Sequence, residues 1–275
     1  MSETTHTRAH VQFPSSALAL KYAATFWFLT AVVGQWLFVA YILSLYGGPT
    51  VTGHFEGWNR NTGLFNGHVT GDTTGNIMFA SHMMGAALIT LAGTVQLVPQ
   101  IRKRARAFHR WNGRVYMATA GIMALGGLYL VWIRHGYFHI PGALAITLNS
   151  VLILVFGALT LRHAMRRNIA AHQRWALRLF MVVSGVWFLR VGLMGWIIIN
   201  QGPVGMTDNM DGWFDLFSVY GSYLVPLAIL ELYLRAKAAG SPVQRYAVSA
   251  LVTAASLVMA VGIFGAYMFM WKAYL

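Results

Sequence analysis

The 275-residue chain has no cysteine, and charged residues make up 10% of it, with seven acids in all. Without cysteine, disulfide frameworks and thiolate sites for zinc or iron–sulfur clusters are excluded. The charged fraction is far below the roughly 25% of typical soluble domains. Hydrophobic residues reach 57%, and the mean hydropathy is +0.56. The composition therefore predicts a polytopic membrane protein whose first partner is the lipid bilayer.

Long apolar runs divide the chain into about seven predicted transmembrane helices, each near the length of roughly 20 residues that crosses the hydrocarbon. No segment is long or polar enough for a separate soluble domain, so residues 1–275 are expected to form a single integral membrane domain, an all-α polytopic helical bundle. Pro226 alone falls inside a run and predicts a kink there. Close helix packing is expected at Gly121, Gly126, Gly127, Gly185, Gly192 and Gly195. The predicted helices cover residues 21–45, 76–98, 115–135, 142–162, 177–199, 214–234 and 247–271.

The net charge of +13 comes from cations that cluster between the apolar runs, so nucleic acid is not an expected partner. Of the 20 Lys and Arg residues, 16 fall on one side of the membrane, three fall on the other, and Arg190 lies within a run. The positive-inside rule then places the N-terminus, with a short tail over residues 1–20, in the cytoplasm and the C-terminus outside. Residues 47–75 form the longest outer connection, which either folds back as a cap or is a mobile polar loop.

Two basic segments with the same order of residues precede the third and fifth predicted helices. Residues 102–114 (RKRARAFHRWNGR) and 166–178 (RRNIAAHQRWALR) each reach a histidine, add a tryptophan and close on an arginine. They predict a site for haem or an anionic head group, or else cations that set topology and pair with lipid phosphates. No acid stands among them, which argues against a structural ion-pair cluster. The shared residues are His109, Trp111 and Arg114 in the first segment, and His172, Trp175 and Arg178 in the second.

Polar side chains within the predicted helices form a second set of candidates, because such groups are costly in the membrane. At about 1.5 Å per residue, six helices each place one such group roughly 9–15 Å from the outer end. Arg190 is the strongest, since a guanidinium cannot deprotonate and no carboxylate lies at its depth. We expect it to contact an exogenous anion, or else backbone carbonyls and neighbouring amides. It follows His172 by eighteen residues, which would place both on one face of a continuous helix. The layer comprises Gln35, His82, Tyr129, Asn149, Arg190 and Tyr220.

His82 is a candidate axial haem ligand, quinone partner or proton relay, with a packing histidine as the alternative. Membrane b-type cytochromes with two haems carry paired histidines roughly four turns apart on facing helices. Here His82 is followed fourteen residues later by Gln96, and Asn149 by His163, so each pair contains one histidine. Haem b is the candidate cofactor. Its candidate iron ligands are His82, His109 and His172, and its other candidate contacts are Asn149, His163, Arg190, Arg114 and Arg178.

The central part of the chain resembles a known family. From Gly85 to Arg190, the ordered set of Gly93, Gln96 and Pro99, then FHRWNGRVY, AHQRWALRLF and FLR, is similar to uncharacterised bacterial inner-membrane proteins that are catalogued as a domain of unknown function. The resemblance implies a multi-pass protein of the bacterial inner membrane. It implies no activity.

Three functions remain open from the sequence. A redox protein that binds haem b or exchanges electrons with quinone ranks first, on the ten histidines and the basic segments. The alternatives are a transporter or binding protein for an anionic or amphiphilic small molecule, and an accessory subunit whose Arg190 pairs with an acid of a membrane partner. The sequence has no nucleophile elbow, phosphate-binding glycine loop or HExxH motif, so it identifies neither an enzyme nor a substrate.

Overall fold

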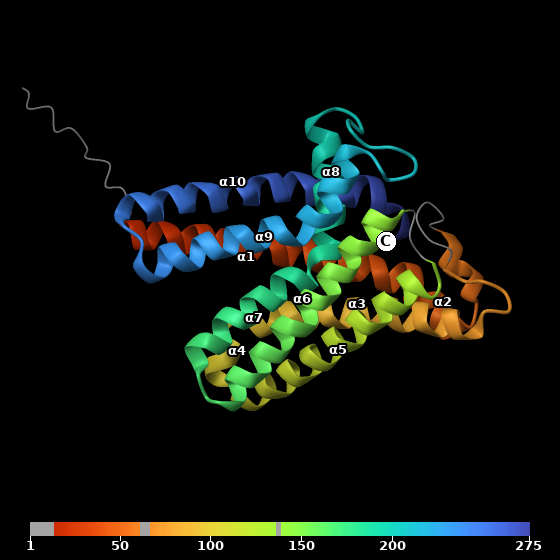
Figure 1. Ribbon diagram of the computed structural model, residues 1–275, viewed down its shortest axis with the longest axis horizontal. Helices are drawn as coiled ribbons and strands as arrows, with labels where there is room; N and C mark the ends of the chain where they lie inside the picture. The colour runs from red at the N-terminus through yellow and green to blue at the C-terminus, as the bar shows by residue number, and fades with distance from the viewer. Residues whose placement is uncertain (1–13, 61–66, 136–138) are drawn as a thin grey trace, which may run out of the picture.

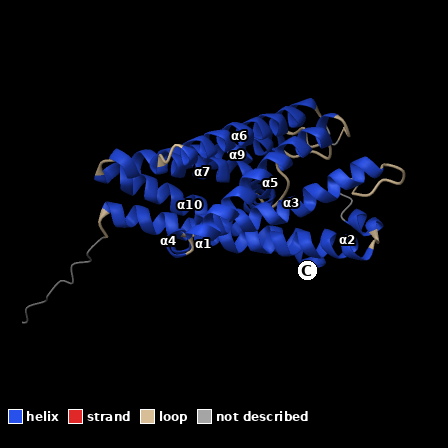
Figure 2. Cartoon of the chain, turned by 90° about the horizontal axis from the view of Figure 1, so that it is seen from below, coloured by secondary structure: helices blue, strands red, loops and turns tan. Residues whose placement is uncertain are grey.

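The structure, a computed structural model, describes residues 14–60, 67–135 and 139–275. Within these ranges the chain forms helices and connecting loops and contains no strand, which confirms the all-α prediction (Figure 2). Most of the predicted N-terminal tail, and residues 61–66 of the predicted outer connection, lie outside the described residues.

Six helices of the described chain are long and apolar enough to cross a membrane, and a bent pair of helices makes a seventh span if it is counted as one. This agrees with the seven spans predicted from the apolar runs. The six are α1 (Ser16–Ile42), extended by a π-helical turn (Leu43–Gly47) and α2 (Gly48–Thr52), then α3 (Thr73–Leu97), α5 (Arg106–Trp132), α6 (Ile140–Met165), α9 (Trp213–Ala239) and α10 (Pro242–Ala266). The short α4 (Pro99–Arg104) joins α3 to α5, and the bent pair is α7 (Ile169–Val183) with α8 (Gly185–Ile199). α9 continues through Pro226 as one helix.

Polar capping residues explain where several helices begin. The side chains of Ser15, Asp72 and Asn168 each accept a hydrogen bond from a backbone N–H three residues further on. These bonds satisfy donors that the first turn of a helix leaves free. α4, α6 and α10 carry proline in their first turn, where its missing N–H has no cost, and α6 and α10 are also capped by the side chains of His139 and Ser241.

The predicted fifth helix is broken at Ser184, where α7 and α8 meet at an angle of 54°. Ser184 and Gly185 stand side by side at the break, and such Gly/Ser pairs are a recognised cause of kinks. The Ser184 hydroxyl also accepts a hydrogen bond of 3.1 Å from Gln35 Nε2 of α1. The expectation that His172 and Arg190 share one helix face is therefore wrong, because they lie in two differently directed helices.

The largest hydrophobic core lies where α1, α3, α8 and α10 pack together. Figure 1 shows α1 and α10 running side by side, while α3, α5, α6 and α7 form a second group inclined to them. Close packing occurs at Gly262, where an added Cβ would lie 2.2 Å from the Val191 carbonyl oxygen. The Cα of Gly262 in turn lies 3.3 Å from the Cβ position of Gly195, as predicted for that residue. The same prediction is wrong for Gly121 and Gly192, whose Cβ positions have no neighbour within 4 Å.

Most of the cations lie at one end of the bundle, called here the basic end, which carries α4 and the connections α6–α7 and α9–α10. At the opposite end, Arg60 donates to the carbonyl oxygens of Ser44 and Leu45 at 3.3 and 3.1 Å. Trp58 of the predicted outer connection is buried there against Phe79. Which end faces the cytoplasm stays a prediction of the positive-inside rule.

Candidate functional site

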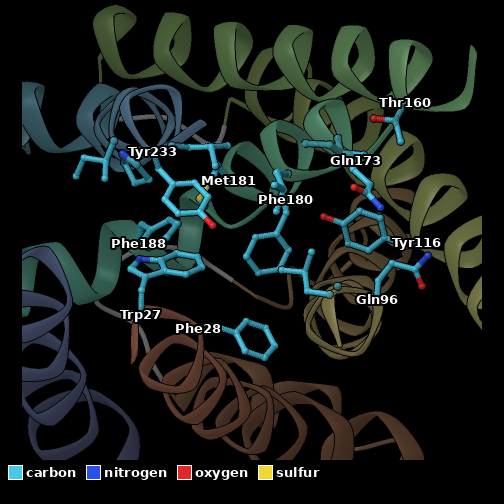
Figure 3. Close-up of a pocket in the computed structure, with 18 of the residues that line it drawn as sticks. Trp27, Phe28, Gln96, Tyr116, Thr160, Gln173, Phe180, Met181, Phe188 and Tyr233 are labelled. Atoms are coloured by element: carbon cyan, nitrogen blue, oxygen red, sulfur yellow. The ribbon is translucent and has the colours of Figure 1, made fainter. Parts of the chain in front are cut away.

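A cavity of about 2190 Å³ runs along the bundle from the basic end as far as Ile199 and Phe214, near the opposite end. Figure 3 shows aromatic side chains from α1 and α8 on one side, including Trp27, Phe28 and Phe188. Polar side chains from α3, α5 and the start of α7 lie on the other side, among them Gln96 and Tyr116. Typical pockets for small ligands measure about 300–1,000 Å³. This cavity therefore has room for a ligand with long apolar chains.

The charged residues that line the cavity share one sign. Six Lys and Arg residues line it, and none of its described lining residues is Asp or Glu. All six are exposed and pair with no described carboxylate, so they can attract anionic groups that approach the apolar interior. The six cations are Lys21, Arg102, Arg106, Arg110, Arg114 and Lys237.

A hydrogen-bond network fixes the polar wall of the cavity where α3 meets α5. Asn112 Nδ2 donates to the Ala92 carbonyl and to Gln96 Oε1, both at 2.8 Å. Gln96 Nε2 in turn donates to the His109 carbonyl at 3.1 Å. Two buried atoms of this wall, His109 Nδ1 and Tyr116 Oη, have no hydrogen-bond partner.

The two basic segments meet at this cavity with similar local geometry. His109 and His172 both line it, and His172 Nδ1 lies 3.1 Å from the Thr160 carbonyl oxygen. The guanidinium carbon of Arg114 lies 4.8 Å from the ring centre of Trp111, a cation–π distance. The matching distance from Arg178 to Trp175 in the second segment is 4.6 Å.

The closing arginines of the two segments differ in their partners. Arg114 lines the cavity, whereas Arg178 is held by Glu231 of α9 through two hydrogen bonds of 2.6 and 2.8 Å. The argument against a structural ion pair among the basic segments is therefore wrong for Arg178. Its acid comes from a helix 53 residues further along the chain, so no local pattern reveals the pair.

Arg190 lies outside the cavity lining, against α1. Its guanidinium carbon is 5.4 Å from the ring centre of Phe38, and Nη1 donates to the Val186 carbonyl at 3.2 Å. Its charge also interacts electrostatically with Tyr41 and Tyr46. Arg190 forms no ion pair with any described carboxylate. Aromatic rings and a backbone carbonyl thus surround the charge that the sequence left without a partner.

His82, Asn149 and Gln35 each keep one buried atom without a partner: Nδ1, Oδ1 and Oε1, respectively. The His82 ring lies over Gly127, whose Cβ position is 3.7 Å from the ring. Asn149 packs beside Gly185, and Gln35 bonds to Ser184, so both amides adjoin the break between α7 and α8. Two members of the predicted polar layer, Gln35 and Asn149, therefore lie at this break. Tyr220, another member, donates to the Pro141 carbonyl at 3.1 Å.

The described residues contain no group of three or more His, Cys, Asp or Glu side chains that could hold a metal ion. This finding does not bear on haem, whose iron takes only one or two ligands from the protein. The candidate iron ligands lie in different parts of the structure. His109 and His172 line the cavity, whereas His82 does not, and the candidate contact His163 is also outside the lining. The Nδ1 atom of His163 is buried without a partner.

Sequence reasoning missed Tyr116 and Gln173 as cavity residues. Tyr116 follows His109 by seven residues, or about two helical turns, so both lie on one face of α5. That spacing is visible in the sequence, but its meaning depends on α5 beginning as early as Arg106. Gln173 directly follows His172 on the first turns of α7.

The model of a family described as predicted membrane protein (DUF2306) matches residues 79–216, which is half of the chain. The matched range contains both basic segments, the break at Ser184 and Arg190. No curated protein and no solved structure matches the chain.

Proposed function

We propose that this chain, which belongs to a family of predicted membrane proteins whose description gives no activity, binds an anionic amphiphile in the cavity at the basic end. The observation that carries the proposal is the lining itself. Aromatic and aliphatic side chains form the interior, six cations accompany them, and no described lining residue is acidic. An amphiphile matches this lining, because its anionic head can contact the cations and its long chains can fill the apolar interior.

The head group is expected to decide which amphiphile binds. Moving an acyl chain from the bilayer into an apolar cavity gains little, because lipid tails are as apolar as the side chains. Basic residues near a membrane surface contribute about 1 kcal/mol each toward an anionic lipid. Arginine can also form two parallel hydrogen bonds to a phosphate. Selectivity should therefore follow head-group charge more than chain length.

Native mass spectrometry of the detergent-purified protein tests this proposal. Phosphatidic acid and phosphatidylglycerol should remain bound at concentrations where phosphatidylcholine with the same chains is lost. They should also raise the unfolding temperature, while phosphatidylcholine does not. Equal retention of the anionic and zwitterionic lipids would contradict the proposal.

A redox function with haem b is the second candidate, favoured by the two histidines in one cavity. Histidines that bind metals commonly hold their other ring nitrogen on a carbonyl or carboxylate. His172 has this arrangement, since Nδ1 faces the Thr160 carbonyl and Nε2 stays available. The arginines of the lining suit haem propionates, and the apolar interior suits the macrocycle. Bound haem would supply one-electron chemistry.

A dithionite-reduced minus air-oxidised visible spectrum tests this second candidate. The protein is purified in mild detergent from haem-supplemented cells. An α-band at the position of b-type haem that is lost in His172→Ala would support it. A flat difference spectrum would remove it and leave the amphiphile proposal in place.

A further inference from the structure

The hydroxyl of Tyr116 is buried in the wall of the cavity without a hydrogen-bond partner. Tyr116 is 6% exposed, and Figure 3 shows its hydroxyl turned into the space between Phe180 and Gln173. A buried polar group that lacks a partner costs free energy. A partner from outside the described chain can reach the hydroxyl through the cavity, which Tyr116 lines.

The packing of Tyr116 keeps this hydroxyl facing the cavity. Its ring passes close to Gly93, where a Cβ would lie 2.9 Å from Tyr116 Cε2 and 3.2 Å from Phe180 Cε2. The ring is thus held between α3 and α7 and cannot turn toward another helix without displacing them.

Two of the neighbouring polar side chains already have partners within the protein. Gln96 bonds to Asn112 and to His109, as described above. The Thr160 hydroxyl donates to the Phe156 carbonyl of its own helix at 2.7 Å. The Tyr116 O–H remains a donor without a partner on this wall. Arg110 and Arg114 precede it on α5 by six and two residues, or about 9 and 3 Å along the helix axis, so both cations lie nearer the basic end.

We propose that the amphiphile is an anionic glycerolipid. Its ester carbonyl accepts a hydrogen bond from Tyr116, while its phosphate lies among the cations that line the cavity. The proposal rests on the proposed function and names its ligand class. In a diacyl phospholipid the ester carbonyls stand just below the phosphate, at the top of the chains. A polyprenyl phosphate has hydrocarbon at that level and would leave the hydroxyl unpaired.

Two lipids that differ in this one feature provide the test. The probes are a diacyl phosphatidic acid and the dialkyl ether phosphatidic acid with chains of equal length, which lacks both carbonyl oxygens. Their affinities for the detergent-purified, full-length protein are compared by native mass spectrometry. Because one neutral hydrogen bond is worth about 1 kcal/mol, the wild type should bind the ester lipid about fivefold more tightly than the ether lipid.

Tyr116→Phe should remove this preference by weakening the ester lipid alone. The variant should fold, because the hydroxyl that it loses has no partner in the protein. Tyr22→Phe is the matched control, since Tyr22 is an exposed tyrosine outside the cavity lining and should keep the ester preference.

The outcomes separate this inference from the proposed function. Equal wild-type affinity for the two anionic lipids, both above phosphatidylcholine, would overturn the glycerolipid inference and leave anionic amphiphile binding intact. An ester preference that survives in Tyr116→Phe would overturn the role of Tyr116. Failure of both anionic lipids to exceed phosphatidylcholine would overturn the proposed function as well.

Discussion

The two ends of the bundle manage polar groups in different ways. At the opposite end, Arg134 pairs with Asp72 at 2.9 Å, and Arg60 donates to carbonyl oxygens of the π-helical turn that follows α1. At the basic end, six cations line a cavity without a described acid among its lining residues. Cations that already have protein partners contribute to structure. Cations that face an open apolar cavity remain available to a ligand.

Packing shows the same contrast. Where α8 crosses α10, Gly195 and Gly262 bring the two backbones into contact. In the cavity wall, Gly121 and Gly192 have open space where a side chain would stand. Glycine therefore serves close packing in one region and cavity volume in the other.

Neutralising three cations of the cavity should have the largest effect. Arg106, Arg110 and Arg114 replaced together by Gln should weaken phosphatidic acid binding about 100-fold, at about 1 kcal/mol per cation. The matched control replaces Arg104, Arg166 and Arg174 by Gln, which are exposed at the same end but outside the lining. Native mass spectrometry measures both. An equal loss in the two triple variants would mean that general attraction, and not this cavity, selects the lipid.

Replacing glycine by alanine should lower stability at a closely packed position and not at a position that faces open space. Gly262→Ala places a Cβ against the Val191 carbonyl and should cost about 2 kcal/mol of stability, within the range for overpacking. Gly192→Ala meets open space and should be neutral or stabilising, since alanine favours the helix. Thermal unfolding in detergent measures both, and equal unfolding temperatures would refute the distinction.

Breaking the Arg178–Glu231 pair should cost less. Arg178→Met leaves a carboxylate without its partner, and we expect a loss of about 1 kcal/mol because both side chains are partly exposed. The double variant with Glu231→Met should recover most of that loss, since replacing both members removes the unpaired charge. Thermal unfolding provides the measurement. A double variant less stable than Arg178→Met would contradict this expectation, because the unpaired carboxylate would then not be the source of the loss.

Arg190→Gln should leave lipid affinity unchanged. Arg190 lies outside the cavity lining, with Phe38 and Tyr41 as neighbours, so its charge does not contact a ligand there. The same native mass spectra used for the triple variants test this. If Arg190→Gln lost as much phosphatidic acid binding as the triple variant, Arg190 would have to belong to the same lipid site as the cavity cations.

The helices were largely predictable, because bilayer thickness sets the length of an apolar run and prolines mark the connections. The break at Ser184 was not, since a Ser–Gly pair also fits an unbroken helix and the bend depends on contacts such as that from Gln35. Pairing of Arg178 with Glu231 escaped prediction because it joins two helices distant in sequence. The residues of the basic segments were identified, whereas the cavity between them arises from the inclination of whole helices, which periodicity within each helix does not encode.

The most direct test of the account is a structure of the protein in nanodiscs that contain phosphatidic acid, determined by electron cryomicroscopy. The account predicts elongated density in the cavity, with its head beside Arg110 and Arg114 and its upper part within hydrogen-bonding distance of the Tyr116 hydroxyl. A cavity closed by packing of α9 against α5, or one that holds no lipid density while phosphatidic acid surrounds the protein, would contradict it.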